Sequence, residues 1–347
     1  MTPQNELRLT QNVQRVGFLA LIPALLRRFG VDPAEILAAA GLGSAALDNP
    51  ESTIPYRAMG NVATLCAEKS GCPHFGLELG ARVRTTSLGI VGELMRSAPT
   101  LGIALMDFTS HQHRHAHGGV AYLLTNKHEA FFGYAVYQPN VPGNNLICDG
   151  AALAAFNLVR ELADTPGADG QGTVVEVLFA RSEPEDLTHW RRLFGVKLRF
   201  DADQTAVVLH RSSLDKPLAS ADAVLRGILE KRVQSLWYAG ELDTLTRLSR
   251  MLRIAVLSGR ISANEIAAQL GMSRRTLHRR LEDQGFRFQE LVDQTRGEFA
   301  RQLLTNTALS VGKIGMIVGY SDPSVFTRAF VRWAGSTPSE WRAKLQS

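Results

Sequence analysis

Cysteine is scarce in this sequence of 347 residues. Cys66, Cys72 and Cys148 are scattered along the chain without C-x-x-C spacing. Disulfide scaffolds and structural zinc modules need paired cysteines, so the sequence excludes both. A sparse and odd set of thiols is typical of a reducing compartment, and we expect a cytoplasmic protein.

Long apolar runs are also missing. The stretch VGFLALIPALL, which starts at Val16, is too short to span a bilayer, and Pro23 interrupts it. It lacks the small-residue cleavage site of a signal peptide. Residues 13 to 29 place their apolar side chains at mostly helical spacing, which predicts one amphipathic helix. We therefore expect no membrane partner.

The common catalytic and nucleotide-binding motifs are absent. The sequence contains no G-x-S-x-G, no G-x-x-x-x-G-K, and no G-x-G-x-x-G after a strand. We predict that the protein is not an enzyme, has no catalytic residues and needs no cofactor. An amino-terminal domain that retained catalysis would turn over a bound ligand, whereas a sensor would only bind it.

Positive charge is confined to the last third of the chain. From Glu241 onward there are 16 Lys and Arg against 10 Asp and Glu, and 14 of the 16 cations are arginine. Residues 1 to 240 hold 22 cations against 23 acids, so the overall net charge of +5 hides a neutral part and a basic part. Arginine suits bidentate contacts with phosphate and guanine, although a solvated helical face would show the same charge.

The first two thirds of the chain mix helical and strand patterns. Short β-branched or aromatic runs start near residues 120, 130, 174 and 205, and a helical stretch starts at Asp149. The segment ADTPGADGQG is a loop by composition. We predict a mixed α/β effector-sensing and dimerisation domain at 1–235, a linker at 236–245, and an all-α domain at 246–347.

An internal repeat organises the basic part. IAAQLGMSRRTLHRRLEDQG, from Ile266, aligns with IGMIVGYSDPSVFTRAFVRWAG, from Ile314. In the first copy Ser262 and Glu265 form a capping box, Gly271 supplies the turn, and Ser273 caps the next helix. The second copy has its own caps, turn glycine and first-turn proline, at Ser310, Gly319, Asp322 and Pro323.

Each copy therefore predicts a helix, a tight turn and a second helix. The apolar positions between the copies trace one helical stripe, which predicts a single long helix joining two helix-turn-helix units; they are Phe288, Leu291, Val292, Thr295, Phe299 and Leu303. Such units bind DNA because the second helix fits the major groove. An α-hairpin repeat for protein contacts is the alternative, but it does not require arginines on both second helices.

The sequence GYSDPSVFTRAFVRWAGSTPSEWR is similar to the carboxy-terminal signature of AraC/XylS-family transcription regulators. The matching positions are Gly319, Tyr320, Asp322, Ser324, Phe326, Arg328, Phe330, Arg332, Gly335, Thr337, Pro338, Trp341 and Arg342. The similarity covers roughly the last hundred residues. Gly315 departs from it, because the family usually has alanine there, and glycine is expected to loosen that helix.

The amino-terminal part resembles an arabinose-binding-type effector domain. The similar stretches are PYRAMGNVATLCAEKSGCPHFGLELGARVR, LGIVGELMRSAPTLGIAL and WRRLFGVKLRFDADQTAVVLHRSSLDKPL. This domain occurs in a subgroup that includes ornithine-utilisation and quorum-sensing or virulence regulators. The resemblance implies a homodimer and a small-molecule effector, but it does not transfer the effector's identity. For a cavity in this domain the sequence offers Tyr122, Phe132, Tyr134 and Tyr137, but simple packing of the sheet is the favoured interpretation of these residues, and we name no ligand-binding residue.

The resemblance assigns DNA-binding roles residue by residue. Arg275, His278 and Arg279 are the expected base readers of the first unit, and Ser324, Thr327 and Arg328 are those of the second. Arg274, Arg280 and Arg332 are expected to contact phosphate, and Thr276 lies on the same reading helix. Pro323 stands where other members often present a polar reader, which removes one expected base contact.

A histidine-rich run is the remaining unusual feature. His111, His113, His115 and His117 would share one face of a strand, or form two i, i+4 pairs on a helix. A metal-responsive site, a pH-responsive cluster and a solvated surface segment all fit this spacing. No acidic residue or cysteine completes a metal shell within the run, and Arg114 lies inside it, so we assign no metal ligand.

These patterns together predict a sequence-specific DNA-binding transcription regulator that is controlled through its amino-terminal domain by a small molecule or a partner. Its expected partners are double-stranded promoter DNA and a second copy of the chain, with RNA polymerase left open. Activator is the working expectation, although nothing in the patterns distinguishes activation from repression. An architectural or ligand-independent DNA binder controlled by its abundance is the alternative.

Overall fold

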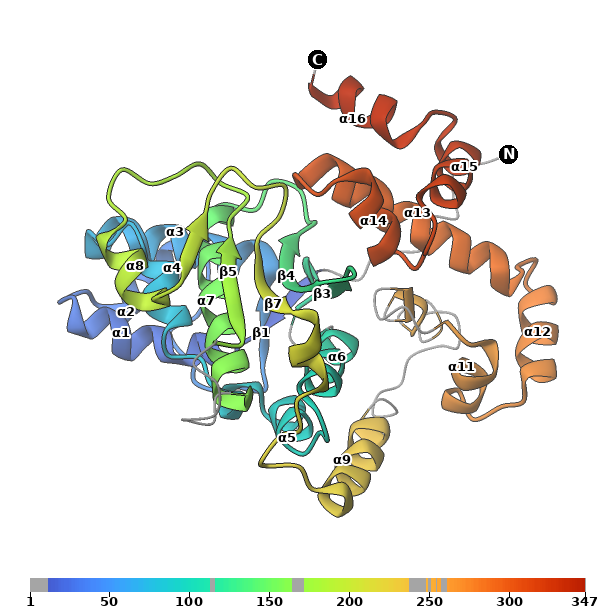
Figure 1. Ribbon diagram of the computed structural model, residues 1–347, viewed down its shortest axis with the longest axis horizontal. Coiled ribbons are helices and arrows are strands. Elements are labelled where there is room, and N and C mark those ends of the chain that lie inside the picture. The colour runs from blue at the N-terminus through green and yellow to red at the C-terminus, as the bar shows by residue number, and fades with distance from the viewer. Residues whose placement is uncertain are drawn as a thin grey trace.

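The computed structural model describes residues 12–112, 116–163, 172–236, 248, 251–253, 255–256 and 261–346. Helices and strands alternate up to residue 236, and only helices follow (Figure 1). The predicted division into a mixed α/β part and an all-α part is therefore confirmed. No described helix combines the length and apolar character needed to cross a bilayer.

Seven short strands lie within the described residues of the amino-terminal part. They are β1 (Val13–Arg15), β2 (Thr53–Pro55), β3 (Gly119–Thr125), β4 (Glu129–Val136), β5 (Val174–Leu178), β6 (Lys197–Arg199) and β7 (Ala206–His210). Strands β1 and β2 pair antiparallel, and the other five form one sheet in the order β3-β4-β7-β5-β6. Only β5 and β6 run parallel in that sheet. The four strands expected from sequence are confirmed, whereas the three-residue strands β1, β2 and β6 were not predicted.

Helices surround this sheet. They are η1 (Gly17–Leu21), α1 (Ile22–Arg28), α2 (Pro33–Ala39), α3 (Tyr56–Ser70), α4 (Phe75–Gly80), η2 (Thr85–Leu88), α5 (Ile90–Arg96), α6 (Leu101–His111), α7 (Asn144–Ala163), α8 (Thr188–Phe194), η4 (Arg211–Asp215) and α9 (Ala223–Leu236). The largest core lies between α6, α7 and the sheet, with Phe132, Phe156 and Val207 buried in it. Helix α7 is the one expected from Asp149, although it begins at Asn144.

The prediction of one helix over residues 13 to 29 is wrong. Its first residues form β1, and the backbone N–H groups of Val16 and Gly17 donate to the carbonyl oxygens of Ser52 and Pro50, both at 2.8 Å. Gly17 also has a φ of +41°, a conformation that L side chains rarely adopt. The helical pattern therefore becomes regular only from η1 into α1. The ADTPGADGQG loop and the predicted linker lie almost wholly outside the described residues.

Glycines let α4 and α7 approach each other closely. A Cβ atom on Gly76 would lie 2.0 Å from the carbonyl oxygen of Leu146, and one on Gly80 would lie 2.4 Å from that of Gly150. Real side chains do not tolerate these distances, so the two backbones touch only because both positions lack a side chain.

The carboxy-terminal part is a chain of six helices after residue 261: α11 (Ala263–Gln269), α12 (Arg274–Glu282), α13 (Phe288–Asn306), α14 (Val311–Ile317), α15 (Pro323–Ala334) and α16 (Pro338–Gln346). The first half of α13 packs with α11 and α12, and its second half packs with α14 and α15 (Figure 1). All six residues of the predicted stripe are buried on α13. The long helix that joins two helix-turn-helix units is confirmed.

The two parts touch through the β3–β4 hairpin. Alternate side chains point to opposite faces of a strand, and one face of the hairpin packs against α13 and α14. The rings of Tyr137 and Phe299 pack edge-on, with 5.3 Å between their centroids. The Asn306 side-chain amide donates to the carbonyl oxygen of Tyr137 at 3.0 Å. At the rim, Lys313 pairs with Asp203 at 2.8 Å.

The α4–α7 contact predicts the effect of two glycine substitutions. Gly76→Ala should lower the free energy of unfolding by about 1–3 kcal/mol, because the new methyl group forces the helices apart. Gly227→Ala is the matched control, since a Cβ there meets nothing within 4 Å and alanine favours the helix. Urea titration followed by circular dichroism measures both. Equal stability of the two variants would contradict the close packing.

Candidate nucleic-acid interface and sensing cavity

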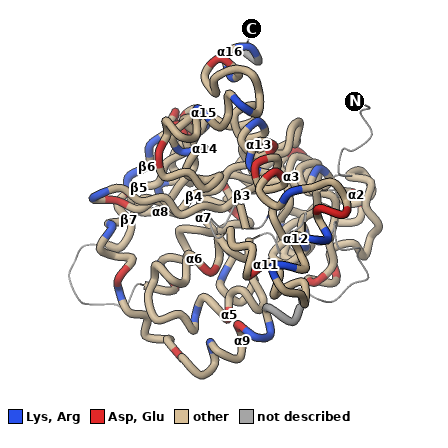
Figure 2. Tube along the Cα trace, turned by 90° about the vertical axis from the view of Figure 1, so that its right-hand side faces the viewer, with Lys and Arg blue, Asp and Glu red and all other residues tan. Residues whose placement is uncertain are grey.

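Helix α12 presents cations to solvent because its core positions are apolar. Ser273 caps the helix by accepting from the Thr276 N–H at 3.1 Å, and Leu277 and Leu281 are buried. The arginines on the opposite surface are exposed, and Figure 2 shows cations on α12; they are Arg274, Arg275, Arg279 and Arg280. The predicted caps at Ser262, Ser310 and Asp322 are also present, although only the Ser262 half of the expected capping box is found.

Two of the predicted α12 residues are less exposed than the arginines. Thr276 is half-buried, and its hydroxyl lies 2.9 Å from that of Ser273. The ring of His278 lies against Phe288 with 6.2 Å between the ring centroids, and Arg274 Nε donates to His278 Nε2 at 3.5 Å. The arginines are therefore the side chains that reach furthest from this helix.

Helix α15 repeats this arrangement with a different surface. Phe326 and Phe330 are fully buried, while Ser324 and Arg328 are exposed. The hydroxyl of Thr327 donates to the carbonyl oxygen of Pro323 at 2.9 Å. Val325 of this helix, which is not among the expected readers, is also exposed, and an apolar side chain can contact the thymine methyl group.

The last predicted DNA contact, Arg332, has a protein partner. Its guanidinium lies 2.8 Å from a carboxylate oxygen of Asp293 on α13, and its side chain is 63% exposed. The ion pair connects α15 to α13 and leaves much of the guanidinium accessible to a phosphate.

Several signature residues serve the fold. Arg342 donates to the carbonyl oxygens of Leu304 at 3.2 Å and Leu309 at 2.6 Å, so it ties α16 to the end of α13. Burial lowers the pKa of this guanidinium below its usual value. The glycine at position 315, where the family usually has alanine, also has a structural reason. A Cβ atom there would lie 3.1 Å from the ring of Phe326.

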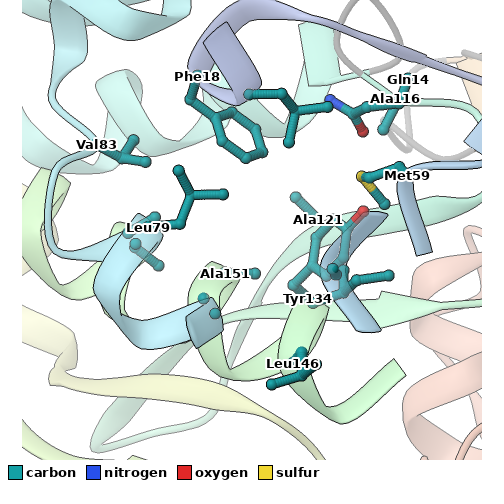
Figure 3. Close-up of a pocket in the computed structure, with 18 of the residues that line it drawn as sticks. Gln14, Phe18, Met59, Leu79, Val83, Ala116, Ala121, Tyr134, Leu146 and Ala151 are labelled. Carbon is teal, nitrogen blue, oxygen red and sulfur yellow. The ribbon is translucent and has the colours of Figure 1, made fainter. Parts of the chain in front are cut away.

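The amino-terminal part contains an apolar cavity of about 130 Å³ that is partly open to solvent. Aliphatic, aromatic and glycine residues from η1, α3, α4, α6, α7, β3 and β4 line it (Figure 3). Of the four aromatic residues proposed for a pocket, Phe132 and Tyr134 line this cavity. Tyr122 lines a second pocket, where the two parts of the chain meet, and Tyr137 packs against the carboxy-terminal helices.

Two protein-family models match the chain. The model described as the arabinose-binding domain of AraC transcription regulators, N-terminal, matches residues 30–218, and a helix-turn-helix domain model matches residues 266–344. The chain belongs to the AraC family. It is a DNA-binding transcription regulator with an amino-terminal effector-binding domain, and the prediction that it is not an enzyme is confirmed by this membership.

Relatives of this AraC-family regulator have similar lengths. The ornithine utilization regulator of Pseudomonas aeruginosa is 26% identical over 341 residues, which cover 97% of this chain and 98% of the relative. The regulator VirS of Mycobacterium tuberculosis is 26% identical over 321 residues, covering 92% and 93%. The crystal structure of CdpR from Pseudomonas aeruginosa matches 78% of this chain and 87% of its own at 24% identity, with a TM-score of 0.40.

The AraC-family regulator has a second, polar pocket of about 110 Å³ where its two parts meet. Asp149 and Gln204 line it from the amino-terminal part, and residues 306–309 line it from the other. Arg181 lies 2.8 Å from one carboxylate oxygen of Asp149, while the second oxygen has no hydrogen-bond partner among the described residues. Burial raises the pKa of Asp149 to about 7, even though Arg181 lowers it.

Only the two ends of the histidine-rich run lie within the described residues. His111 ends α6, where its ring nitrogen Nδ1 lies 2.8 Å from the carbonyl oxygen of Asp107, and the His117 N–H donates to Val13. His113 and His115 lie outside the described residues. A metal site in this run therefore stays a hypothesis.

A different group in this regulator has metal-ligand geometry. Ligand atoms of His74, Glu78 and His189 lie within 4.8 Å of one another. Glu78 and His189 already have partners: Arg82 lies 2.9 Å from Glu78, Arg192 lies 2.8 Å from Nδ1 of His189, and Nε2 of His189 lies 2.9 Å from the other carboxylate oxygen of Glu78. Burial, followed by the nearby His189, lowers the pKa of His74. Sequence reasoning missed this group because its members come from α8 and the region of α4, far apart along the chain.

The buried Asp149 predicts a pH dependence of stability. Its pKa rises from about 3.9 in an unfolded chain to about 7 in the folded regulator. The folded state therefore binds more protons between these values, and this residue makes the free energy of unfolding fall as pH rises from about 4 to about 7. Asp149→Asn should flatten that slope in urea titrations at several pH values. Asp203→Asn leaves Asp149 in place and should keep the wild-type slope. An identical slope in all three proteins would refute the raised pKa of Asp149.

Proposed function

We propose that this AraC-family regulator reads two successive major-groove segments of promoter DNA with each protomer. One observation carries the proposal: two capped, outward-facing helices, α12 and α15, flank the single helix α13. A 19-residue helix is about 28 Å long, which is close to the roughly 34 Å of one DNA turn. The slightly shorter protein spacing would favour DNA that bends toward the protein.

The two reading helices have different chemistry. Arg275, His278 and Arg279 would read base edges from α12, where arginine suits guanine. Ser324, Thr327 and Arg328 would read them from α15. Arg274, Arg280 and Arg332 would contact phosphates, and Thr276 would lie beside the backbone. A basic unit and a more neutral unit would make the first segment depend more strongly on salt than the second.

Residues 1–235 would sense the effector and residues 246–347 would read DNA. The β3–β4 hairpin would couple them, because one of its faces lines the apolar cavity and the other packs on α13 and α14. A ligand that favours one placement of the hairpin would shift the population in which both reading helices reach their sites. The ornithine utilization regulator and VirS align with this chain over both parts, and we transfer no effector from either.

Substitution of Arg279 separates base reading from phosphate contact. On a cognate site selected from random DNA, Arg279→Ala should weaken binding by about 1–3 kcal/mol and relax the preference at one base pair. Arg280→Ala is the matched control on the same helix, and it should weaken binding evenly across sequences and lower the salt slope by about one. Fluorescence anisotropy with a panel of single-base variants measures both. If the two variants behave alike, Arg279 is a phosphate contact. If the wild type binds its selected site no more tightly than random DNA, the protein is an architectural DNA binder.

We also propose that a second copy of the chain covers α9. This helix exposes Val224 to 77% and Ile228 to 59%, and both lie on one helical face four residues apart. It is followed directly by the connector to the DNA-reading helices, so a two-fold contact here would set the spacing of the two pairs of reading helices.

Charge on that face should prevent dimerisation. Ile228→Glu should convert a dimer to a monomer in sedimentation-equilibrium experiments, because an ionised carboxylate cannot be buried unpaired in an apolar contact. Glu230→Ala alters a neighbouring exposed residue of α9 and should leave the assembly unchanged. A wild-type chain that sediments as a monomer at micromolar concentration would contradict this surface.

A further inference from the structure

The apolar cavity has walls that select against polar ligands. Only Gln14, Gln112 and Tyr134 carry polar side-chain atoms among the residues that line it, and none of the lining residues is charged at neutral pH. Amino acids, polyamines and sugars would lose hydrogen bonds to water without replacement in such surroundings. The chemistry of the walls therefore fits an apolar molecule.

Small residues keep this space available. Gly76 and Gly80 of α4 and Ala151 and Ala154 of α7 all line the cavity, and larger side chains at these positions would occupy its volume. Figure 3 shows Ala151 at the cavity wall. At about 130 Å³ the cavity approaches the roughly 150 Å³ of an engineered apolar cavity that binds benzene. A ligand of about one aromatic ring matches this size.

The polar end of the cavity offers hydrogen-bond acceptors. The Gln112 side-chain N–H groups donate to the carbonyl oxygens of Ala116 at 3.4 Å and Gly119 at 3.2 Å. The Gln14 side-chain N–H donates to the carbonyl oxygen of Arg15 at 2.9 Å. The amide oxygens of these two lining residues therefore remain to accept a hydrogen bond from a bound molecule. The hydroxyl of Tyr134 is already 2.8 Å from that of Tyr56. This end of the cavity therefore favours a ligand that donates.

The cavity also touches the element that meets the DNA-reading part. Ala121, Phe132 and Tyr134 line it from the β3–β4 hairpin. The other face of the same hairpin contributes Tyr122 and Tyr137 to the core shared with α13 and α14. A molecule in the cavity would thus contact the strands whose opposite face packs against α13 and α14.

We propose that this cavity is the effector site and that it takes a neutral, largely apolar molecule the size of one aromatic ring with a single hydrogen-bond donor. The effector role rests on the proposed function, whereas the binding chemistry does not. Polar compounds such as ornithine or arabinose are excluded from this cavity by the walls described above.

Two probes of nearly equal shape test the chemistry. With the full-length protein, p-cresol should bind saturably in calorimetry and raise the melting temperature as the linkage relation requires. The isosteric p-xylene lacks the hydroxyl group and should bind about tenfold more weakly, because one hydrogen bond is lost. L-Ornithine, putrescine and L-arabinose should give no saturable binding at this site.

Three variants locate the site. Ala151→Phe should abolish p-cresol binding by filling the cavity, and Ala154→Leu fills the same space with less bulk if the larger side chain unfolds the domain. Ala38→Phe places the same ring on the exposed surface of α2 and should bind p-cresol like the wild type. Gln112→Met should reduce p-cresol binding to the level of p-xylene and leave p-xylene binding unchanged.

The possible results separate the site from the effector role. Failure of both aromatic probes to bind the wild type, or their undiminished binding to folded Ala151→Phe and Ala154→Leu, would overturn the site. A polar compound that binds the wild type and is lost in Asp149→Asn would place the effector in the junction pocket and overturn the proposal. Binding of p-cresol without any change in operator affinity would keep the cavity chemistry and reject the effector role. Specific DNA binding that no aromatic ligand alters would support the proposed reading of DNA by α12 and α15 and reject the cavity as the effector site.

Discussion

Helix α13 buries one continuous apolar stripe in two separate cores, and the carboxy-terminal part depends on this burial. Phe288, Leu291 and Val292 close the core under α11 and α12, while Phe299 and Leu303 close the core under α14 and α15. Both reading helices are thus fixed to one rigid element. Their separation and relative orientation are set by the helical rise and twist between the two sets of buried residues.

Like α13, the β3–β4 hairpin contributes to two separate cores, and it connects the amino-terminal part to the carboxy-terminal part. A strand directs alternate residues to opposite faces, so one hairpin can line a cavity with Phe132 and pack on a second domain with Tyr137. The contact with the carboxy-terminal part combines buried hairpin residues such as Val120 and Tyr122 with the Tyr137–Phe299 aromatic pair, the Asn306–Tyr137 hydrogen bond and the Lys313–Asp203 ion pair.

The residues that mark the AraC family have different physical roles. Phe326 and Phe330 fill a core, Asp322 caps a helix, and Arg342 holds the end of α13 through two carbonyl oxygens. Arg328 instead faces solvent. The signature therefore identifies the fold mostly through structural residues, while sequence specificity would reside in exposed positions between them.

The sequence by itself determined the helix-turn-helix repeat, because its signals are local. A capping serine, a turn glycine with positive φ and an apolar period of 3.6 act within a few residues, and Ser273, Gly271 and Leu277 behave as predicted. The same reasoning failed over residues 13 to 29, where pairing of β1 with β2 overrides a helical pattern. Only the tertiary structure decided the apolar cavity, the Asp149 pocket and the His74–Glu78–His189 group. Each is built from segments far apart in the chain, and their proximity depends on backbone contacts, such as that of Gly76 with Leu146, that no local pattern encodes.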